Sequence, residues 1–342
     1  MNGLSVILCT HAPRVEYLAR VLHSLQYQTL DKGRWELLIV DNASATGLFQ
    51  KKEFSWPSNT RFLSEEVLGL MHARKRGQAN ARHDILVFVD DDNVLDPAYL
   101  KTALELFESN PLLGCVSGCI RPEYEEAPPP WFKGEYESWI AVRRIENDWI
   151  SNFRSERSEP CGAGMVVRRA ILDKLFKDWS DSGLVLGRSG SSLLSGEDVE
   201  ISGAALRNGY FIGQIRSLQL THLISARRTD SEYLFRLYRN ICASGRLLSW
   251  KGGEKKPQLS TREFFKDQCT HQACTRTNIK DGRVRAFCNR GPDCCTIILV
   301  EVRDDVYPLG VILLCNPVEC IPDLFHEFTS PLFSIKMVTP FL

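Results

Sequence analysis

Apolar and polar positions alternate regularly over the first 120 residues of the chain. Leu4–Cys9 and Glu36–Val40 are short runs rich in β-forming residues, and each stops at a polar side chain. Both runs therefore predict buried strands. Between them, apolar residues recur at helical spacing over Arg14–Gln28. A strand, a helix and a strand in this order predict a parallel pair joined by a right-handed crossover.

The same alternation continues with two further helices and two further strands. Helical spacing covers Leu68–Arg82 and Pro97–Glu108, and apolar runs cover Ile85–Val89 and Gly114–Ile120. This pattern is typical of a doubly wound, mostly parallel α/β sheet, in which ligands bind beyond the carboxyl ends of the strands.

After residue 120 the pattern changes. Glu123–Lys133 contains EEAPPPWFK, where three prolines exclude a helix, and we expect a loop over the binding site. Its Trp131 and Phe132 either stack on a sugar or pack under the loop itself. The other expected elements are helices over Tyr136–Glu146, Glu197–Asn208 and Ser231–Trp250, a strand over Met165–Val167, two short strands within Tyr210–His222, and a Gly/Ser-rich lid or surface loop over Ser180–Ser195.

The composition is that of an ordinary globular protein. Of 342 residues, 44% are hydrophobic and 25% are charged, and 42 basic residues balance 42 acidic ones. These values exclude a largely disordered chain and a generally basic nucleic-acid binder. No apolar run approaches the roughly 20 residues that span a bilayer, and the first residues do not resemble a secretory leader. We therefore expect a cytoplasmic protein that crosses no membrane.

Positive charge is concentrated in one region, Arg227–Arg290, which holds fifteen Lys and Arg against six Asp and Glu. Such a region suits either a phosphorylated ligand or an anionic membrane surface. The amphipathic helix expected over 231–250 lies within it and either packs on the rest of the domain or adds apolar contact with a membrane. Peripheral contact with the inner face of a membrane is thus one expectation.

Residues 251–342 form a C-terminal extension without a clean hydrophobic period, and seven of the twelve cysteines lie in it. A structural zinc site needs four soft ligands, and the candidates are Cys269, His271, Cys274, Cys288, Cys294 and Cys295. Their spacings lack Cys-x-x-Cys pairs. Free, reduced thiols are therefore the alternative in a cytoplasmic protein.

The strongest local signal is VFVDDDN, Val87–Asn93, where an apolar strand ends in three consecutive aspartates. Adjacent carboxylates repel one another unless a cation compensates them, and Mg²⁺ or Mn²⁺ takes oxygen ligands from one or two carboxylates together with phosphates of a ligand. The alternative, an acidic turn that caps the next helix, explains only one of the three aspartates. The motif therefore predicts a site for a divalent metal ion and a diphosphate.

Five motifs in a fixed order give the chain a resemblance to a known family. They are strand-end Thr10, strand-end Asp41, the triplet Asp90–Asp92, CGAGMVVRR at Cys161–Arg169 and SGEDVEIS at Ser195–Ser202. In this order and spacing the chain resembles family 2 glycosyltransferases of the GT-A fold, over roughly residues 3–250. The resemblance implies a Rossmann-like nucleotide-sugar-binding half, residues 1–120, and an acceptor-binding and catalytic half, residues 121–250.

The resemblance also implies roles in binding the donor. Thr10 and Asp41 would contact the base and ribose of the nucleotide, and Asp90 the ribose. Asp92 would ligate the metal ion, Mn²⁺ or Mg²⁺, while Asp91 holds the variable middle position of the donor site.

Residues further along the chain complete the implied site. His222 matches a position that completes the metal shell in some relatives, although a lone histidine is more often structural. Arg227 and Arg228 are candidate contacts to the donor phosphates, whose developing charge needs compensation. The small residues at the donor-sugar and acceptor pocket are, by resemblance, Gly162, Ala163 and Gly164.

A second acidic motif, Gly196–Glu197–Asp198, opens the helix expected over 197–208. Transfer to a hydroxyl group needs a base that takes its proton, and a carboxylate at a helix start can be placed to do so. The resemblance assigns this role to Asp198, with Glu197 orienting the acceptor or the base. The alternative is that these acids only stabilise the helix N-terminus.

Together the motifs predict transfer of a sugar from a nucleotide-diphosphate sugar to a glycan or a lipid-linked sugar, in polysaccharide or glycoconjugate synthesis. The resemblance implies inversion at the anomeric carbon. One alternative is a sugar-phosphate nucleotidyltransferase, but THAPRVEY stands where that class has a Gly-rich basic loop. The other is a catalytically silent binding protein, against which the intact Asp90, Asp92 and Asp198 argue.

Overall fold

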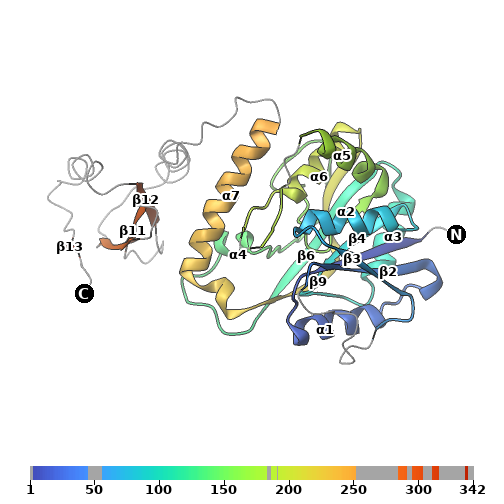
Figure 1. Cartoon of the computed structure of the whole chain (residues 1–342), viewed down its shortest axis with the longest axis horizontal. Coiled ribbons are helices and arrows are strands. Elements are labelled where there is room, and N and C mark those ends of the chain that lie inside the picture. Colours follow the sequence, from blue (N-terminus) through green and yellow to red (C-terminus); the bar gives the residue numbers. More distant parts are fainter. Residues whose placement is uncertain are drawn as a thin grey trace. The chain divides into compact units, whose positions relative to one another are not determined.

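The computed structural model describes residues 3–44, 56–182, 186–190 and 192–251, and further along the chain the backbone of four strands. These parts belong to two compact units, Met1–Glu254 and Lys255–Leu342 (Figure 1). The first unit contains every residue that the resemblance assigns to the site.

The N-terminal half of the first unit is a parallel α/β array. Its elements are β1 (Leu4–Thr10), α1 (Val15–Gln26), β2 (Trp35–Asn42), β3 (Thr60–Glu65), α2 (Leu70–Asn80), β4 (Ile85–Asp90), β5 (Asn93–Leu95) and α3 (Tyr99–Ser109). β1 pairs in parallel with β2 and β4, and β2 pairs in parallel with β3. The predicted parallel pairing of β1 with β2 and the three predicted helices of this half are confirmed, whereas β3 and β5 were not predicted.

The second half extends the sheet with mixed pairing. Its elements are β6 (Leu113–Tyr124), α4 (Glu135–Trp139), β7 (Trp149–Ser151), β8 (Val166–Arg168), α5 (Arg169–Ser182), α6 (Glu197–Arg207), β9 (Phe211–Ile224) and α7 (Ser231–Lys251). The strand order is β3-β2-β1-β4-β8-β6-β9-β5, with β7 paired to β9. β8 runs antiparallel to both of its neighbours, and β6 and β9 are parallel to each other.

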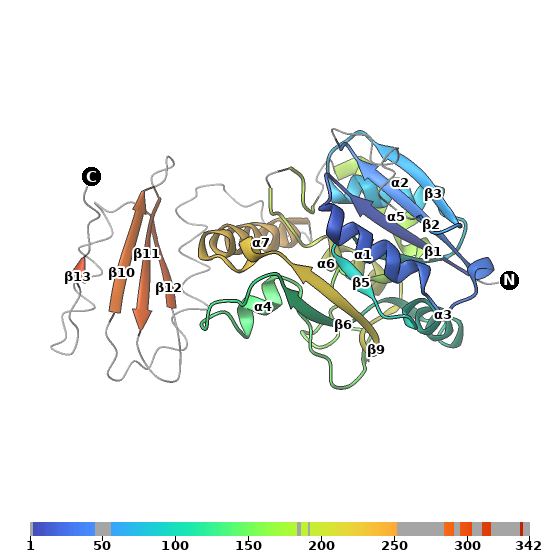
Figure 2. The ribbon, with the colours of Figure 1, turned by 90° about the horizontal axis from the view of Figure 1, so that it is seen from below.

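Both faces of the sheet are covered, because each strand sends alternate side chains into two separate cores. Leu4, Val6 and Leu8 of β1 pack in one core with α1 and α3, while Ile7 and Cys9 pack in the other with α2, α5 and α6. Figure 2 shows α1 in front of β1 and β2, with α2 and α5 behind them. Burial on both faces explains why the strand sequences are continuous apolar runs.

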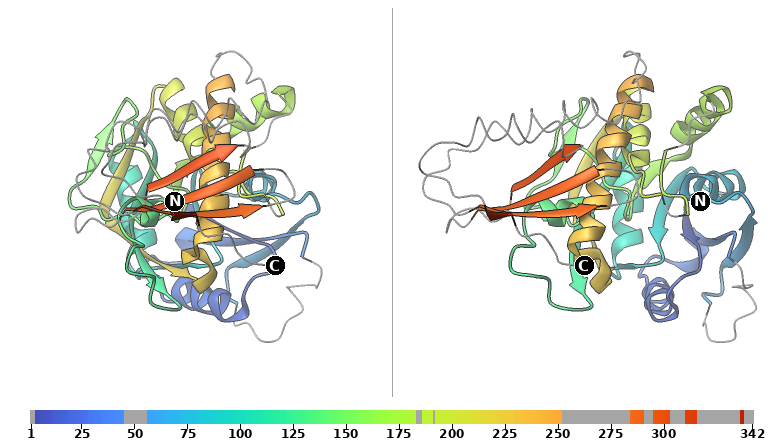
Figure 3. Two further views of the ribbon diagram at one scale, coloured as in Figure 1. Left: turned by 90° about the vertical axis from the view of Figure 1, so that its left-hand side faces the viewer. Right: turned by 60° about the vertical axis from the view of Figure 1, so that its left-hand side comes forward.

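A third, smaller core holds α7, the long golden-orange helix in Figure 3. Leu234 and Leu237 of α7 pack there with buried Phe132. Trp131 is half-buried, with its ring edge-on to Tyr136 at 5.5 Å. Of the two alternatives for the aromatic pair, the structure shows packing beneath its own loop.

The helix predicted over 136–146 exists only over its first residues, and its predicted length is wrong. α4 ends at Trp139, and Ala141 then takes a positive φ of 67°, which a helix does not tolerate. The turn brings Arg143 into an antiparallel bridge with Ile120. Pairing with the sheet therefore overrides the local helical pattern.

The division of 210–222 into two short strands is also wrong, because β9 is one strand of 14 residues. Its register against β6 shifts between Gly118 and Cys119, so that a bulge at 216–218 of β9 has no partner in β6. The bulge interrupts the alternation of buried and exposed positions, as bulges do, and this break imitates the end of a strand. The strand predicted over 114–120 likewise continues to Tyr124, and α5 was not predicted.

The second unit contains β10 (Val284–Arg290), β11 (Cys295–Val302), β12 (Gly310–Cys315) and β13 (Lys336–Met337), in the order β12-β11-β10-β13. Of the zinc candidates, Cys288 lies on β10 and Cys295 on β11, and the other four lie outside the described residues. Much of the basic region, residues 252–283, also lies outside them. The zinc site and the membrane contact therefore stay predictions.

Candidate active site

Three parallel strands end at one edge of the sheet, and their last residues begin the site. β1 ends at Thr10, which pairs with Asp41 of β2, and Asp90 of β4 pairs with Cys9. Because parallel strands point the same way, their carboxyl ends meet at one edge. Thr10 and Asp41 are both buried there.

Hydrogen bonds fix these strand ends. Thr10 Oγ1 donates to Asp91 Oδ2 at 2.5 Å, so that the middle aspartate of the triplet is tied to β1. Asp41 Oδ1 accepts from the backbone N–H of Ser44 at 3.2 Å. Asp41 thus faces the loop that follows β2, of which residues 45–55 lie outside the described part.

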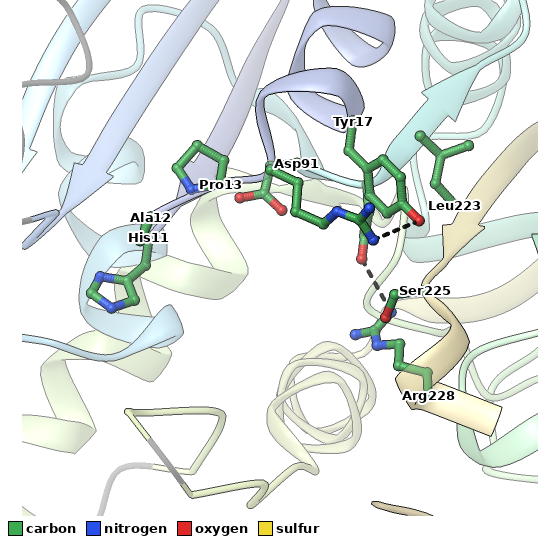
Figure 4. A pocket seen from close by; sticks show the side chains of 10 residues that line it. His11, Ala12, Pro13, Tyr17, Asp91, Leu223, Ser225 and Arg228 are labelled. Atoms are coloured by element: carbon green, nitrogen blue, oxygen red, sulfur yellow. Dashed lines mark hydrogen bonds and ion pairs between the residues drawn. The ribbon is translucent and has the colours of Figure 1, made fainter. Parts of the chain in front are cut away.

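An open pocket of about 220 Å³ lies beyond these strand ends (Figure 4). Its lining residues are His11, Ala12, Pro13, Arg14, Tyr17, Asp91, Asp92, Leu223, Ser225 and Arg228. Asp92 and Arg228 meet there although they are 136 positions apart in the chain. Sequence reasoning missed the contribution of residues 11–17. Their position directly after a buried strand was the signal that could have found it.

Burial and mutual repulsion shape the acidity of the triplet. Burial, with Asp92 beside it, raises the pKa of Asp91 to about 7. Burial also raises the pKa of Asp90, although the nearby Arg74 opposes the shift. For Asp92 the effect of burial is outweighed by His222 and Arg228, which hold its pKa below the usual range. The surroundings of Asp92 therefore favour its charged form, whereas those of Asp90 and Asp91 disfavour it.

The partners of Asp92 come from β9 and the 3₁₀ turn after it, Ala226–Thr229. Asp92 Oδ2 lies 3.3 Å from His222 Nε2 and 3.1 Å from the Arg228 NH1 nitrogen. β5 pairs antiparallel with β9 and sets Asn93 opposite His222. The ladder therefore brings together the metal ligands implied by the resemblance, Asp92 and His222, and adds Arg228 to them.

The geometry fits a divalent ion held by two protein ligands. Two adjacent ligands of one Mg²⁺ ion at about 2.1 Å lie about 3.0 Å apart, close to the 3.3 Å between Asp92 Oδ2 and His222 Nε2. Within the described residues of the first unit, no three His, Cys, Asp or Glu side chains are arranged to hold a metal. Phosphate oxygens and water would supply the remaining ligands, as Mg²⁺ prefers.

Sequence reasoning missed Arg74, which links the triplet to the second acidic motif. Its side chain is 1% exposed, and its guanidinium lies 3.6 Å from Asp90, 3.8 Å from Glu197 and over the ring of Phe88. The signal was an arginine at helical spacing from Met71 on the buried face of α2. A buried arginine needs acidic partners, and these two carboxylates provide them.

The second acidic motif forms the first turn of α6. Gly196 precedes it with a positive φ of 91°, and Asp198 is half-buried. Asp198 Oδ2 accepts from the backbone N–H of Gly162 at 3.2 Å, and Oδ1 accepts from that of Val199 at 2.8 Å. These hydrogen bonds hold the Asp198 carboxylate beside the small-residue segment that the resemblance assigned to the acceptor.

Glu197 is buried, and its Oε2 has no hydrogen-bond partner among the described residues. Burial and the adjacent Asp198 raise its pKa to about 7, against the opposing charges of Arg74 and Arg188. Arg188 belongs to the Gly/Ser-rich segment, where its carbonyl oxygen accepts from the Leu70 N–H of α2 at 2.9 Å. Glu197 therefore gains or loses its proton near neutral pH.

This raised pKa predicts a pH-dependent effect of Glu197→Gln on stability. Folded protein binds more protons at Glu197 than unfolded protein between pH 4.5 and 7, so the stability of the wild type falls as pH rises through that window. The variant lacks this fall. We therefore expect its free energy of unfolding, relative to that of the wild type, to be about 2 to 3 kcal/mol higher at pH 8 than at pH 4. Urea denaturation at both pH values measures the change.

An exposed glutamate provides the control for this experiment. Glu16→Gln on α1 removes the same charge from the surface and is measured in the same way. An equal free energy difference at pH 4 and pH 8 for Glu197→Gln would contradict the raised pKa.

The remaining predicted residues differ in their placement. Gly164 has a positive φ of 69°, and a Cβ atom there would lie 2.5 Å from Leu220; its carbonyl oxygen accepts from the Tyr99 hydroxyl at 2.5 Å. Ala163 is buried. Packing alone therefore requires a glycine at position 164. Arg227 is exposed and does not line the pocket.

Comparison with known proteins decides the family. Residues 5–176, half of the chain, match the model described as glycosyl transferase family 2. The chain belongs to this family. The matched residues of this glycosyl transferase family 2 protein include all three strand ends, the aspartate triplet, Arg74 and Gly162. They end before Asp198, His222 and Arg228.

Two curated relatives match only parts of this family 2 chain. A glucosyl-dolichyl phosphate glucuronosyltransferase of Haloferax volcanii is 22% identical over 165 residues, which are 45% of this chain and 52% of that protein. An uncharacterized glycosyltransferase of Haemophilus influenzae is 31% identical over 113 residues, or 33% and 37% of the two chains. The chain thus spans about half the length, or less, of these relatives.

A solved structure of the family 2 fold is similar over a longer stretch. The crystal structure of S. aureus TarS 1-349 in complex with UDP-GlcNAc has a TM-score of 0.50 and 17% identity, and the match covers 80% of this chain and 74% of that one. This likeness shows the GT-A fold that the sequence predicted. In the described part of the chain, no helix is both long and apolar enough to cross a bilayer.

Proposed function

We propose that this chain transfers a sugar from a nucleotide-diphosphate sugar to an acceptor hydroxyl group, by a single displacement with inversion. The observation that carries the proposal is the joining of two acidic sites by one buried arginine. The triplet at the end of β4 meets Arg74 through Asp90, and Arg74 meets the first turn of α6 through Glu197. Donor binding and proton removal would thus occur at adjacent positions.

On the donor side, Thr10 and Asp41 at the strand ends would contact the nucleoside, and the pocket lined by Asp91, Asp92 and Arg228 would take the diphosphate. Asp92 and His222 would hold Mn²⁺ or Mg²⁺. Such an ion, when bound, compensates the negative charge that develops on the leaving diphosphate. Arg228 adds a guanidinium suited to phosphate oxygens.

On the acceptor side, Asp198 would take the proton of the attacking hydroxyl group. Its carboxylate is half-buried and held by two backbone N–H groups, which fix its orientation toward a bound acceptor. Glu197, buried between Asp198 and Arg74, would position the base. The relative from Haloferax volcanii acts on a dolichyl phosphate-linked sugar by its name, which supports a lipid-linked sugar or another glycan as the acceptor here.

A donor screen tests the proposal. The full chain is incubated with UDP-, GDP- and dTDP-sugars, Mn²⁺ and a set of glycan and lipid-linked sugar acceptors, and released nucleotide diphosphate is measured. We expect one nucleotide to support release and EDTA to abolish it. Release of pyrophosphate from a nucleoside triphosphate and a sugar 1-phosphate would instead identify a nucleotidyltransferase. Binding of nucleotide-sugars without any turnover would identify a silent binding protein.

A further inference from the structure

Arg228 occupies the two atoms that Asp92 and His222 would offer to a metal ion. Its NH1 nitrogen lies 2.6 Å from His222 Nε2 and 3.1 Å from Asp92 Oδ2. A guanidinium has donors and no acceptor, so Arg228 donates to both atoms. A metal ion needs the same lone pairs, and the two cations cannot hold them together.

His222 is buried, and its Nε2 is the ring nitrogen that faces Asp92 and Arg228. No hydrogen-bond partner for its Nδ1 lies within the described part of the chain. The contact between His222 and Arg228 therefore lies at the nitrogen that would bind a metal ion.

The two acceptors are positioned by backbone pairing between strands, whereas Arg228 reaches them with a long side chain from a turn. His222 lies in the ladder between β9 and β5, and the carbonyl oxygen of Asp92 accepts from the Leu223 N–H at 2.8 Å. Arg228 instead lies on a short 3₁₀ turn, and its long side chain lines the open pocket beside Ser225.

We propose that Arg228 is an exchangeable cation of the metal site. In the free enzyme it neutralises Asp92 and keeps Asp92 and His222 from binding a metal ion. When a diphosphate enters the pocket, its oxygens attract the guanidinium, as arginine pairs well with phosphate, and the two ligands become free for the metal. The metal then binds with the nucleotide rather than before it. This inference rests on the proposed function.

Binding of Mn²⁺ to the full chain without nucleotide tests the exchange, with free Mn²⁺ measured by electron paramagnetic resonance. We expect weak binding to the wild type and about tenfold tighter binding to Arg228→Gln, because the competing cation is gone. The same variant should bind UDP together with Mn²⁺ about tenfold more weakly, because the phosphate contact is lost. The two effects have opposite signs, which a general loss of structure would not produce.

Two further variants distinguish the exchange of Arg228 with the metal ion from a general effect of positive charge near the site. Arg227→Gln removes the same charge from the exposed neighbouring position, and its Mn²⁺ affinity should stay within twofold of the wild type. Arg228→Lys keeps the charge and should lie between wild type and Arg228→Gln. Equal Mn²⁺ affinity of the wild type and Arg228→Gln would overturn the proposed exchange but not the metal site of the proposed function. If Mn²⁺ binds no variant, with or without UDP, both the exchange and the metal site of the proposed function are wrong.

Discussion

Asp198→Asn should lower kcat for sugar transfer by a factor of about 10² to 10⁴, the range typical for loss of a general base. The amide keeps the shape of the side chain and can still accept from the N–H of Gly162, but it cannot take the proton of the acceptor. Nucleotide affinity should therefore stay within a few-fold of the wild type. Released nucleotide diphosphate measures kcat, and calorimetry with UDP measures the affinity.

The control for this prediction is Asp178→Asn on the exposed face of α5, which should leave both quantities unchanged. If Asp198→Asn retains turnover, the base lies elsewhere, and Glu197 is the next residue to replace. A large loss of UDP affinity in the same variant would instead show that Asp198 supports the donor site.

Asp92→Asn should abolish the dependence of nucleotide binding on the metal and reduce kcat/KM by about 10³-fold or more, since a metal ion contributes several kcal/mol of charge stabilisation. Among the triplet, Asp92 contacts both His222 and Arg228 and has the lowered pKa. Calorimetry with UDP should show strong binding to the wild type with Mn²⁺ and weak binding with EDTA.

For the variant, we expect equally weak binding in Mn²⁺ and in EDTA. Asp96→Asn serves as the control, because Asp96 lies four positions further on and pairs with Arg121 at the surface, at 2.8 Å. Mn²⁺-dependent binding that survives in Asp92→Asn would move the metal to another carboxylate. Equal UDP affinity of the wild type in Mn²⁺ and EDTA would remove the metal from the proposal.

The alternation of apolar runs with helical patterns was sufficient to predict the parallel half of the fold and the edge that carries the site. This prediction worked because the strands there are buried on both faces, so their sequences are continuous apolar runs that end at polar residues such as Thr10 and Asp41. Parallel strands must then place these ends together. The order of the motifs further along the chain was sufficient to predict the family.

The errors fall where tertiary pairing overrides the local pattern. The bulge in β9 breaks the period of two, and Ala141 ends α4 so that Arg143 can pair with Ile120. Neither constraint is local, because in each case the chain adapts to a strand that lies far away in the sequence. A local period records only the preferences of its own segment.

Two arginines show which part of the site the sequence predicts and which part only the tertiary structure determines. The acidic motifs are visible in the chain because identical charges stand side by side, and their repulsion already requires cations. Packing decides which cations pair with these acids. Arg74 reaches Asp90 and Glu197 from the buried face of α2. Arg228 reaches Asp92 from 136 positions further along the chain. A single basic residue carries no pattern of its own, so its partner is decided only when the elements come together.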